Sequence, residues 1–250
     1  MASVSLTDVS VTFPIYDASN TSLKKRLLPT LTGGRIGAAS AHVPVVQALE
    51  DITISIEHGD RVGLVGHNGA GKTTLLRVLA GIFEPAQGQV RISGRPVPLF
   101  DIGLGMDSEG TGYENIYLRG LFLGMPRKEI SKRLDDIASF TQLGDFLHLP
   151  IRTYSTGMRM RLAFAISTSV EPDILLLDEG IGAGDAAFVE QANQRIQSFA
   201  DSAGIIVLAS HSEQLIRRIC STAVLMEHGR VIEFGSVDTV LERYRERSKP

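Results

Sequence analysis

Eight residues in the first third of the chain combine glycines, a lysine and a threonine in a spacing suited to phosphate chemistry. They read Gly66-His67-Asn68-Gly69-Ala70-Gly71-Lys72-Thr73 and follow the pattern G-x-x-x-x-G-K-T. The glycines let backbone N–H groups turn inward around a phosphate chain. In this pattern the ammonium of Lys72 reaches the β- and γ-phosphates, and the hydroxyl of Thr73 binds Mg²⁺. These residues, together with Thr74, are therefore predicted to bind a nucleotide.

The segments on either side of this loop supply the context that the pattern requires. An apolar run at 61–65 precedes it and is predicted to be a β-strand, and a helical pattern at 74–80 follows it and ends at Gly81. The helix N-terminus then brings its positive dipole end to the phosphates. This context nearly excludes the alternative, a glycine-rich turn with a purely structural role.

Two neighbouring carboxylates follow another apolar run. Residues 174–177 are predicted to form a buried strand, and Asp178 and Glu179 come directly after it. Beside a phosphate loop, this strand end lies at the carboxyl edge of the sheet, where ligands bind in open α/β folds. We expect Asp178 to hold Mg²⁺ and Glu179 to act as the general base on the attacking water. The alternative is a polar strand end that caps the next turn.

Two further segments carry weaker signals of their own. The buried strand predicted at 205–209 leads to His211, which suits a hydrogen bond to the γ-phosphate, although it could instead bond a neighbouring carbonyl. The segment 154–158 reads Tyr-Ser-Thr-Gly-Met. There Ser155 suits a helix N-cap, and Gly157 lets a ligand approach the backbone. By physical chemistry alone this second segment is no more than a helix start.

Composition is that of an ordinary globular protein. The chain has 250 residues, of which 43% are hydrophobic and 21% charged, and this suits one large α/β domain. The net charge of −3 gives no general electrostatic argument for nucleic acid, and the single cysteine, Cys220, fits a reducing compartment. Residues 1–8 do not resemble a signal peptide, and no apolar run approaches the ~18 residues that span a bilayer. We therefore expect a soluble or peripheral protein.

The order of the motifs resembles the nucleotide-binding subunit of ABC (ATP-binding cassette) transporters, and the resemblance covers nearly the whole chain. It implies one nucleotide-binding domain over 1–250: an α/β P-loop NTPase (RecA-like) core with an antiparallel β-subdomain and a helical subdomain at about 105–155. It also implies ATP and Mg²⁺ as cofactors, and a head-to-tail dimer that sandwiches two ATP molecules. Ser155, Thr156 and Gly157 then match the signature motif, which binds the γ-phosphate held by the opposite subunit. Asp185 matches the loop that crosses the dimer interface.

Departures from the common pattern indicate one branch of that family. The signature is usually L-S-G-G-Q, and the glutamine of the Q-loop is replaced here, in our alignment, by Asp101. With 114–116 and 178–188, these variants resemble the ATPase subunits of polysaccharide exporters, which move lipid-linked O-antigen, capsule, teichoic acid or galactan chains. Some relatives carry a C-terminal carbohydrate-binding domain, which we do not expect in a chain that ends at Pro250.

The resemblance implies an ATPase that drives export through a separate membrane permease, as a complex of two copies of each. It would be peripheral, at the cytoplasmic face of the inner membrane, and without a nucleic acid partner. Closure on ATP would be transmitted through the Asp101 loop and the helical subdomain. The alternatives are an ATPase of another transporter class, a soluble ABC ATPase that acts on ribosomes or DNA, and a kinase-type phosphotransferase.

Two segments remain. The insertion 17–44 contains a basic amphipathic stretch with Lys24, Lys25 and Arg26, and it resembles an extra helix near the membrane interface in the exporter branch; a solvated surface loop is the alternative. An adenine platform is also expected. We place it at Phe13, with Tyr16 as a nearby alternative, and expect stacking to contribute on the order of 1 kcal/mol.

Overall fold

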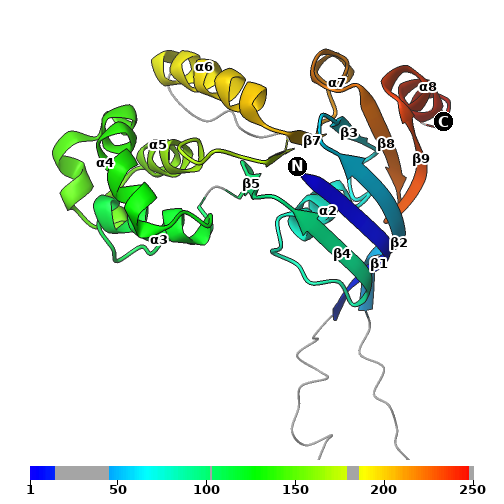
Figure 1. Ribbon diagram of the computed structural model, residues 1–250, viewed down its shortest axis with the longest axis horizontal. Helices are drawn as coiled ribbons and strands as arrows, with labels where there is room; N and C mark the ends of the chain where they lie inside the picture. Colours follow the sequence, from blue (N-terminus) through cyan, green and yellow to red (C-terminus); the bar gives the residue numbers. More distant parts are fainter. Residues whose placement is uncertain (15–44, 102, 179–185, 248–250) are drawn as a thin grey trace, which may run out of the picture.

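The computed structural model describes residues 1–14, 45–101, 103–178 and 186–247. The described strands form two sheets, which Figure 1 shows together with the helices around them. The larger sheet has six strands, in the order β5 (Pro96–Pro98), β6 (Ile174–Asp178), β7 (Ile205–Ala209), β3 (Arg61–Val65), β8 (Thr222–Glu227) and β9 (Arg230–Ser236). Neighbours from β5 to β8 are parallel, and β9 pairs antiparallel with β8. Because β3 lies between two parallel neighbours, β7 and β8, the segment that follows it begins at the carboxyl edge of the sheet and away from the sheet's outer strands.

The smaller sheet is antiparallel, with β1 (Ser3–Pro14) between β2 (Val45–Glu57) and β4 (Gln87–Ser93). The sequence pattern predicts two separate strands at 45–48 and 52–57, but the structure has one continuous strand. The interruption is absorbed by irregular pairing, with Asp8 and Asp51 at φ 52° and 51°. The backbone N–H of Asp51 donates to Ser10 Oγ at 3.0 Å, which holds the bulge in place. Aspartate tolerates this left-handed conformation better than most residues do.

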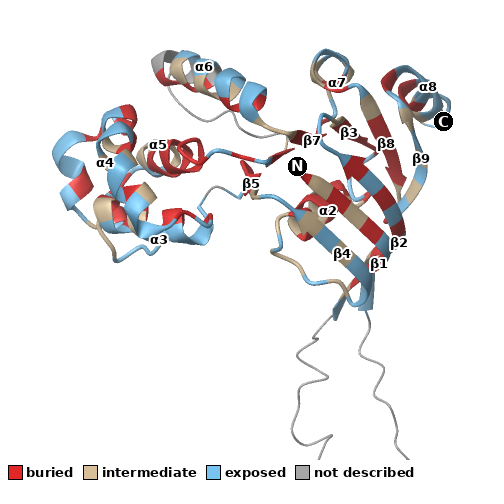
Figure 2. Ribbon diagram, in the orientation of Figure 1, coloured by how far each residue is buried: buried red, intermediate tan, exposed pale blue. Residues whose placement is uncertain are grey.

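Two hydrophobic cores lie on opposite faces of the larger sheet. On one face α2 (Lys72–Leu79) packs between the two sheets, and Ile174 and Leu176 point into that core. Leu175 and Leu177 point into the other core, which the remaining helices cover. Strands buried on both faces read as unbroken apolar runs. This is why 174–177 and 205–209 lack alternation, and Figure 2 shows these strands buried while the helices expose their outer faces.

A group of helices lies at one end of the molecule (green in Figure 1). It consists of α3 (Gly112–Phe122), α4 (Arg127–Thr141), the 3₁₀ turns η2 (Gly144–His148) and η3 (Ile151–Thr153), and α5 (Thr156–Ser167). α3 begins with a capping box, in which Thr111 Oγ1 accepts from the N–H of Glu114 and the Glu114 carboxylate accepts from the N–H of Thr111. The sequence predicts a helical stretch from 113 to about 149 with breaks at Pro126 and Gly144, and the structure has both breaks. Pro126 directly precedes α4, and Gln142 turns left-handed at φ 56° after α4 ends, two residues before Gly144.

Three helices complete the fold: α6 (Ala186–Ser202), α7 (Glu213–Ile219) and α8 (Val237–Arg247). The short α7, capped by the Ser212 side chain, is absent from the sequence predictions. Cys220 is buried at its end, and burial raises the pKa of this thiol to about 12. Within the described residues, no helix combines the length and apolar character needed to cross a membrane.

Candidate nucleotide site

The glycine-rich loop joins β3 to α2, and the fold requires glycine at two of its positions. At Gly66 an added Cβ would lie 2.3 Å from the carbonyl oxygen of Met226, so no larger residue fits against β8. Gly71 is the residue before α2 and takes φ 105°, a conformation that favours glycine. The loop therefore begins in close contact with β8 and ends in a left-handed turn at Gly71. The first N–H groups of α2, which have no partners within the helix, follow directly after this turn.

Lys72 is nearly buried, with 8% of its surface exposed. Its Nζ donates to the carbonyl oxygens of Gly66 at 2.5 Å and His67 at 3.0 Å. The loop therefore holds the ammonium close to its own backbone. A positive charge in that position is suited to meet the phosphates of a nucleotide.

Thr73 and Asp178 are far apart in sequence but adjacent in space. Thr73 Oγ1 donates to Asp178 Oδ2 at 2.9 Å. Mg²⁺ prefers octahedral oxygen ligands at about 2.0–2.1 Å, which sets neighbouring ligand oxygens about 2.9 Å apart. The two oxygens thus have the chemistry and the spacing of adjacent magnesium ligands, so the residues fit the ion predicted from the sequence.

A cavity of about 280 Å³ opens above the phosphate loop and collects most of the predicted groups. Residues 68–74 form its floor, and Asp178 and His211 line its wall. The parallel pairing of β6 with β7 sets Asp178 beside Ala209, two residues before His211. The sheet therefore brings three separate motifs to one edge, as the sequence predicts for a nucleotide site.

Some lining residues are not among the sequence predictions. Val46, Gln47 and Ala48 of β2 form part of the wall, and Ser210 lies next to His211. No local pattern marks 46–48 as part of a site. Contacts with distant residues hold this part of β2 there, because the N–H of Glu50 donates to the Gly229 carbonyl oxygen at 2.8 Å and the N–H of Gly229 donates to the Ala70 carbonyl oxygen at 3.0 Å. Glu179 and Asp185 lie outside the described residues, and their predicted roles stay predictions.

The predicted signature lies on the helical group rather than at this cavity. Ser155 is the N-cap of α5, as predicted, and its Oγ accepts from the N–H of Met158 at 3.2 Å. Among the described residues, a Cβ added at Gly157 would have only Ser155 Oγ within 4 Å, at 3.9 Å. Packing against this part of the chain therefore does not require glycine there. None of residues 155–157 is among the described residues that line the phosphate cavity.

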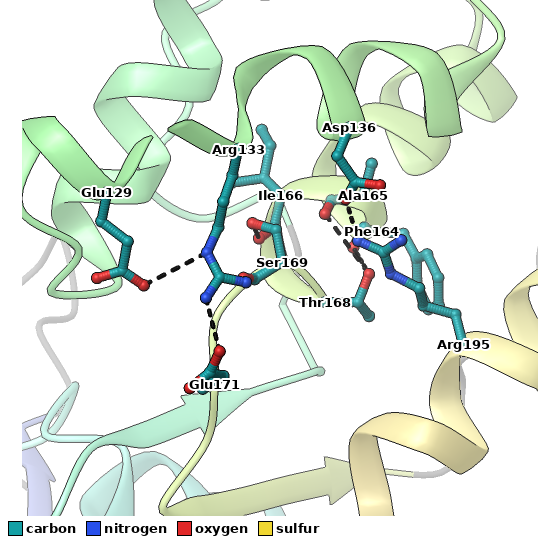
Figure 3. A network of polar contacts seen from close by, with 10 residues as sticks. All are labelled: Glu129, Arg133, Asp136, Phe164, Ala165, Ile166, Thr168, Ser169, Glu171 and Arg195. Atoms are coloured by element: carbon teal, nitrogen blue, oxygen red, sulfur yellow. Dashed lines mark hydrogen bonds and ion pairs between the residues drawn. The ribbon is translucent and has the colours of Figure 1, made fainter. Parts of the chain in front are cut away.

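A polar network, drawn in Figure 3, holds the far end of α5 against its neighbours. Arg133 of α4 donates to the Ser169 carbonyl oxygen at 2.6 Å and to Glu171 at 2.7 Å. Arg195 of α6 donates to Asp136 at 2.8 Å and lies 4.7 Å from the centre of the Phe140 ring. These contacts tie α4, α5 and α6 together, so the signature helix has a fixed position within the subunit.

Asp101 and Phe13 lie near α2 but outside the described lining of the cavity. Asp101 takes φ 48° and pairs with Arg77 at 2.7 Å. Phe13 is partly exposed and packs edge-on against Phe83, with ring centres 5.1 Å apart. The Q-loop role of Asp101 and the adenine role of Phe13 stay predictions, and Tyr16 lies outside the described residues.

Two histidines meet beside the loop. The rings of His67 and His228 are 5.1 Å apart, and His228 occupies the tight β8–β9 turn at φ 48°. The adjacent Glu227 carboxylate has its pKa lowered, chiefly by hydrogen bonds from Arg247 and to a smaller extent by these imidazoles. The outer side of the phosphate loop therefore packs near the C-terminal helix α8.

Comparison with known proteins agrees with this geometry. A family profile for ABC transporters matches residues 49–182, just over half of the chain. The chain belongs to the ABC transporter family, and it is an ATP-binding, ATP-hydrolysing cassette of that family.

Individual relatives are similar over most of their length. An O-antigen export system ATP-binding protein from Yersinia enterocolitica is 45% identical, over 93% of this chain and 98% of the relative. A teichoic acids export ATP-binding protein from Listeria monocytogenes is 36% identical, over 97% of this chain and 70% of the relative. A solved structure of an ABC transporter ATP-binding subunit superposes with a TM-score of 0.66 at 22% identity, covering 98% of this chain and 95% of that one, which supports the fold.

Proposed function

We propose that this chain is the ATP-hydrolysing subunit that powers export of a polysaccharide, or of its lipid-linked precursor, through a separate membrane permease. The observation that carries the proposal is the nearly full-length similarity to an O-antigen export ATP-binding protein, at 45% identity. A second export system, for teichoic acids, is also among the relatives. The cavity at the phosphate loop supplies the site where ATP would bind.

Each residue of the proposed site has a distinct task. The loop N–H groups and Lys72 bind the phosphate chain, and Thr73 and Asp178 hold Mg²⁺, which would neutralise phosphate charge when bound. His211 contributes a hydrogen bond toward the γ-phosphate. Glu179 takes the proton from the attacking water, and its place directly after Asp178 in the sequence supports this role.

The signature residues support a dimer. Ser155, Thr156 and Gly157 lie at the exposed start of α5, and Gly157 has open space around it. A helix N-terminus with a glycine and no covering side chain is suited to receive a phosphate from outside the subunit. We therefore propose a head-to-tail dimer that closes on two ATP molecules, with Asp185 at the interface. Cassettes of this fold have been solved as dimers.

The partner at the membrane follows from the same proposal. Relatives of this chain are named as ATP-binding proteins of export systems, which supports a second, membrane-embedded kind of chain as its partner. We propose two permease subunits bound to two copies of this protein, on the cytoplasmic face of the membrane. The insertion at 17–44, whose structure lies outside the described residues, would lie near that interface through Lys24, Lys25 and Arg26.

Complementation in cells tests this function. Cells in which the chromosomal copy is deleted should lose the exported polysaccharide from their surface and regain it with the wild-type chain but not with Lys72→Ala. Deleting 20–40, or changing Lys24, Lys25 and Arg26 to glutamate, should leave ATP binding intact while impairing export. Normal surface polysaccharide in the deletion strain would refute the proposal.

A further inference from the structure

Arg77 lies on α2, five residues after Lys72, and contacts two other parts of the protein at once. Its Nε and Nη2 both donate to Asp101 Oδ2, at 2.8 and 2.7 Å. Its guanidinium carbon also lies 5.5 Å from the centre of the Phe83 ring. Phe83 in turn packs edge-on against Phe13. One side chain thus bridges the loop at Asp101 and a pair of aromatic rings.

The Asp101 end of this bridge has a constrained backbone. β5 and the residues after it run beside β6, with Leu99 N–H donating to the Leu176 carbonyl oxygen at 2.9 Å. The chain then turns at Asp101, which takes φ 48°, and the N–H of Leu104 donates back to the Asp101 carbonyl oxygen at 2.8 Å. Aspartate adopts this left-handed conformation at a lower cost than most other non-glycine residues, and contacts with its surroundings help to hold it there. The ion pair with Arg77 supplies such a restraint.

We propose that Arg77 is a positioning residue that couples the loop at Asp101 to the aromatic pair Phe13–Phe83. The coupling runs through α2, whose first turn carries Lys72 and Thr73. A base stacked on Phe13 orders Phe83, which fixes the guanidinium and therefore the carboxylate of Asp101. The inference rests on the proposed nucleotide site and adds a residue that the sequence motifs do not contain.

Arginine has properties that this position uses. Its planar guanidinium bonds a carboxylate along its edge while its face covers an aromatic ring, whereas a lysine ammonium is a hydrated point charge. Arg77→Lys should therefore keep part of the ion pair but lose the coupling. Asp101→Asn removes the charge and keeps a residue that tolerates φ 48°, so it isolates the ion pair from backbone strain.

The test is a double-mutant cycle on steady-state ATP hydrolysis by the purified chain. We expect Arg77→Met and Asp101→Asn each to lower kcat by about 3–10-fold, and the double variant to be no worse than either single one. Phe83→Leu should raise the KM for ATP and leave kcat unchanged. Of the single variants, only Arg77→Met should change both kcat and KM. Arg243→Met serves as the matched control, because it removes an exposed ion pair with Glu246 within α8 and should change neither parameter.

Multiplicative effects of Arg77→Met and Asp101→Asn would overturn the proposal, as would full rescue of kcat and KM by Arg77→Lys. If Arg77→Met lowers the melting temperature, the comparison of Asp101→Asn with Phe83→Leu still separates kcat from KM effects. If Asp101→Asn and Phe83→Leu changed kcat and KM to the same extent, the proposed coupling would also be overturned. Absence of ATP hydrolysis by the wild-type chain would contradict the proposed site instead, so the two failures can be told apart.

Discussion

Replacing Asp178 by asparagine removes one negative charge and exchanges one carboxylate oxygen for an amide NH2 group of similar size. The amide oxygen of asparagine can still accept the hydrogen bond that Thr73 Oγ1 donates to Asp178 Oδ2 at 2.9 Å. The residue ends β6, where it is half-buried and pairs with Ala209, and the substitution keeps its size. We therefore expect the melting temperature to stay within a few degrees of the wild type, since no cavity is created and the half-buried position leaves the new amide NH2 within reach of water.

The effect on magnesium-dependent hydrolysis should be large. Two unit charges about 4 Å apart attract by about 4 kcal/mol at an effective dielectric constant of 20, and this corresponds to about 10³-fold. Partial exposure of Asp178 weakens the interaction, while the double charge of the metal ion strengthens it. We expect Asp178→Asn to lower kcat/KM for MgATP by about 10²–10³-fold and to raise the Mg²⁺ concentration that gives half-maximal activity.

The assay titrates Mg²⁺ at fixed ATP with purified protein and follows phosphate release. Asp173→Asn is the matched control, because Asp173 directly precedes the same strand at its opposite end and accepts a hydrogen bond from the N–H of Arg95 at 2.7 Å. That control should keep the wild-type Mg²⁺ dependence. An unchanged Mg²⁺ midpoint and rate in Asp178→Asn would refute the assignment of this carboxylate to the metal.

Three further predictions concern the lysine of the phosphate loop, the proposed general base and a surface ion pair. Lys72→Ala should abolish ATP hydrolysis and weaken nucleotide binding, because it removes the ammonium from the loop; near wild-type turnover would contradict this. Glu179→Gln should keep ATP affinity, lose about 10²–10⁴-fold in hydrolysis and accumulate a closed dimer on size-exclusion chromatography with MgATP; normal turnover would point to another base, His211 first. The pKa of Glu213 is lowered from 4.5, mainly by the hydrogen bond from Arg245, so the stabilisation by this pair is present above pH 4.5 and is lost as the pH falls through the folded-state pKa. Urea unfolding of wild type and Arg245→Met should therefore differ more at pH 7 than at pH 3, and a difference independent of pH would exclude the pair as its cause.

Local patterns in the sequence were enough to predict much of the fold and of the candidate site. The strands at 61–65 and 205–209 have the predicted bounds, because an apolar run is a property of consecutive residues. The phosphate loop is equally local, since its glycines and Lys72 act within eight positions. The N-cap at Ser155 depends on a contact only three residues away.

Contacts between distant segments could not be predicted in this way. Nothing near Arg77 in the sequence indicates that its partner is Asp101, and nothing near Val46 indicates that it lines the cavity. The hydrogen bond from Thr73 to Asp178 joins residues 105 positions apart and exists because β6 and β3 end at the same edge of the sheet. Residue types and short spacings therefore determined which chemistry the chain carries. The pairing of strands, which depends on long-range packing, determined which of those groups meet.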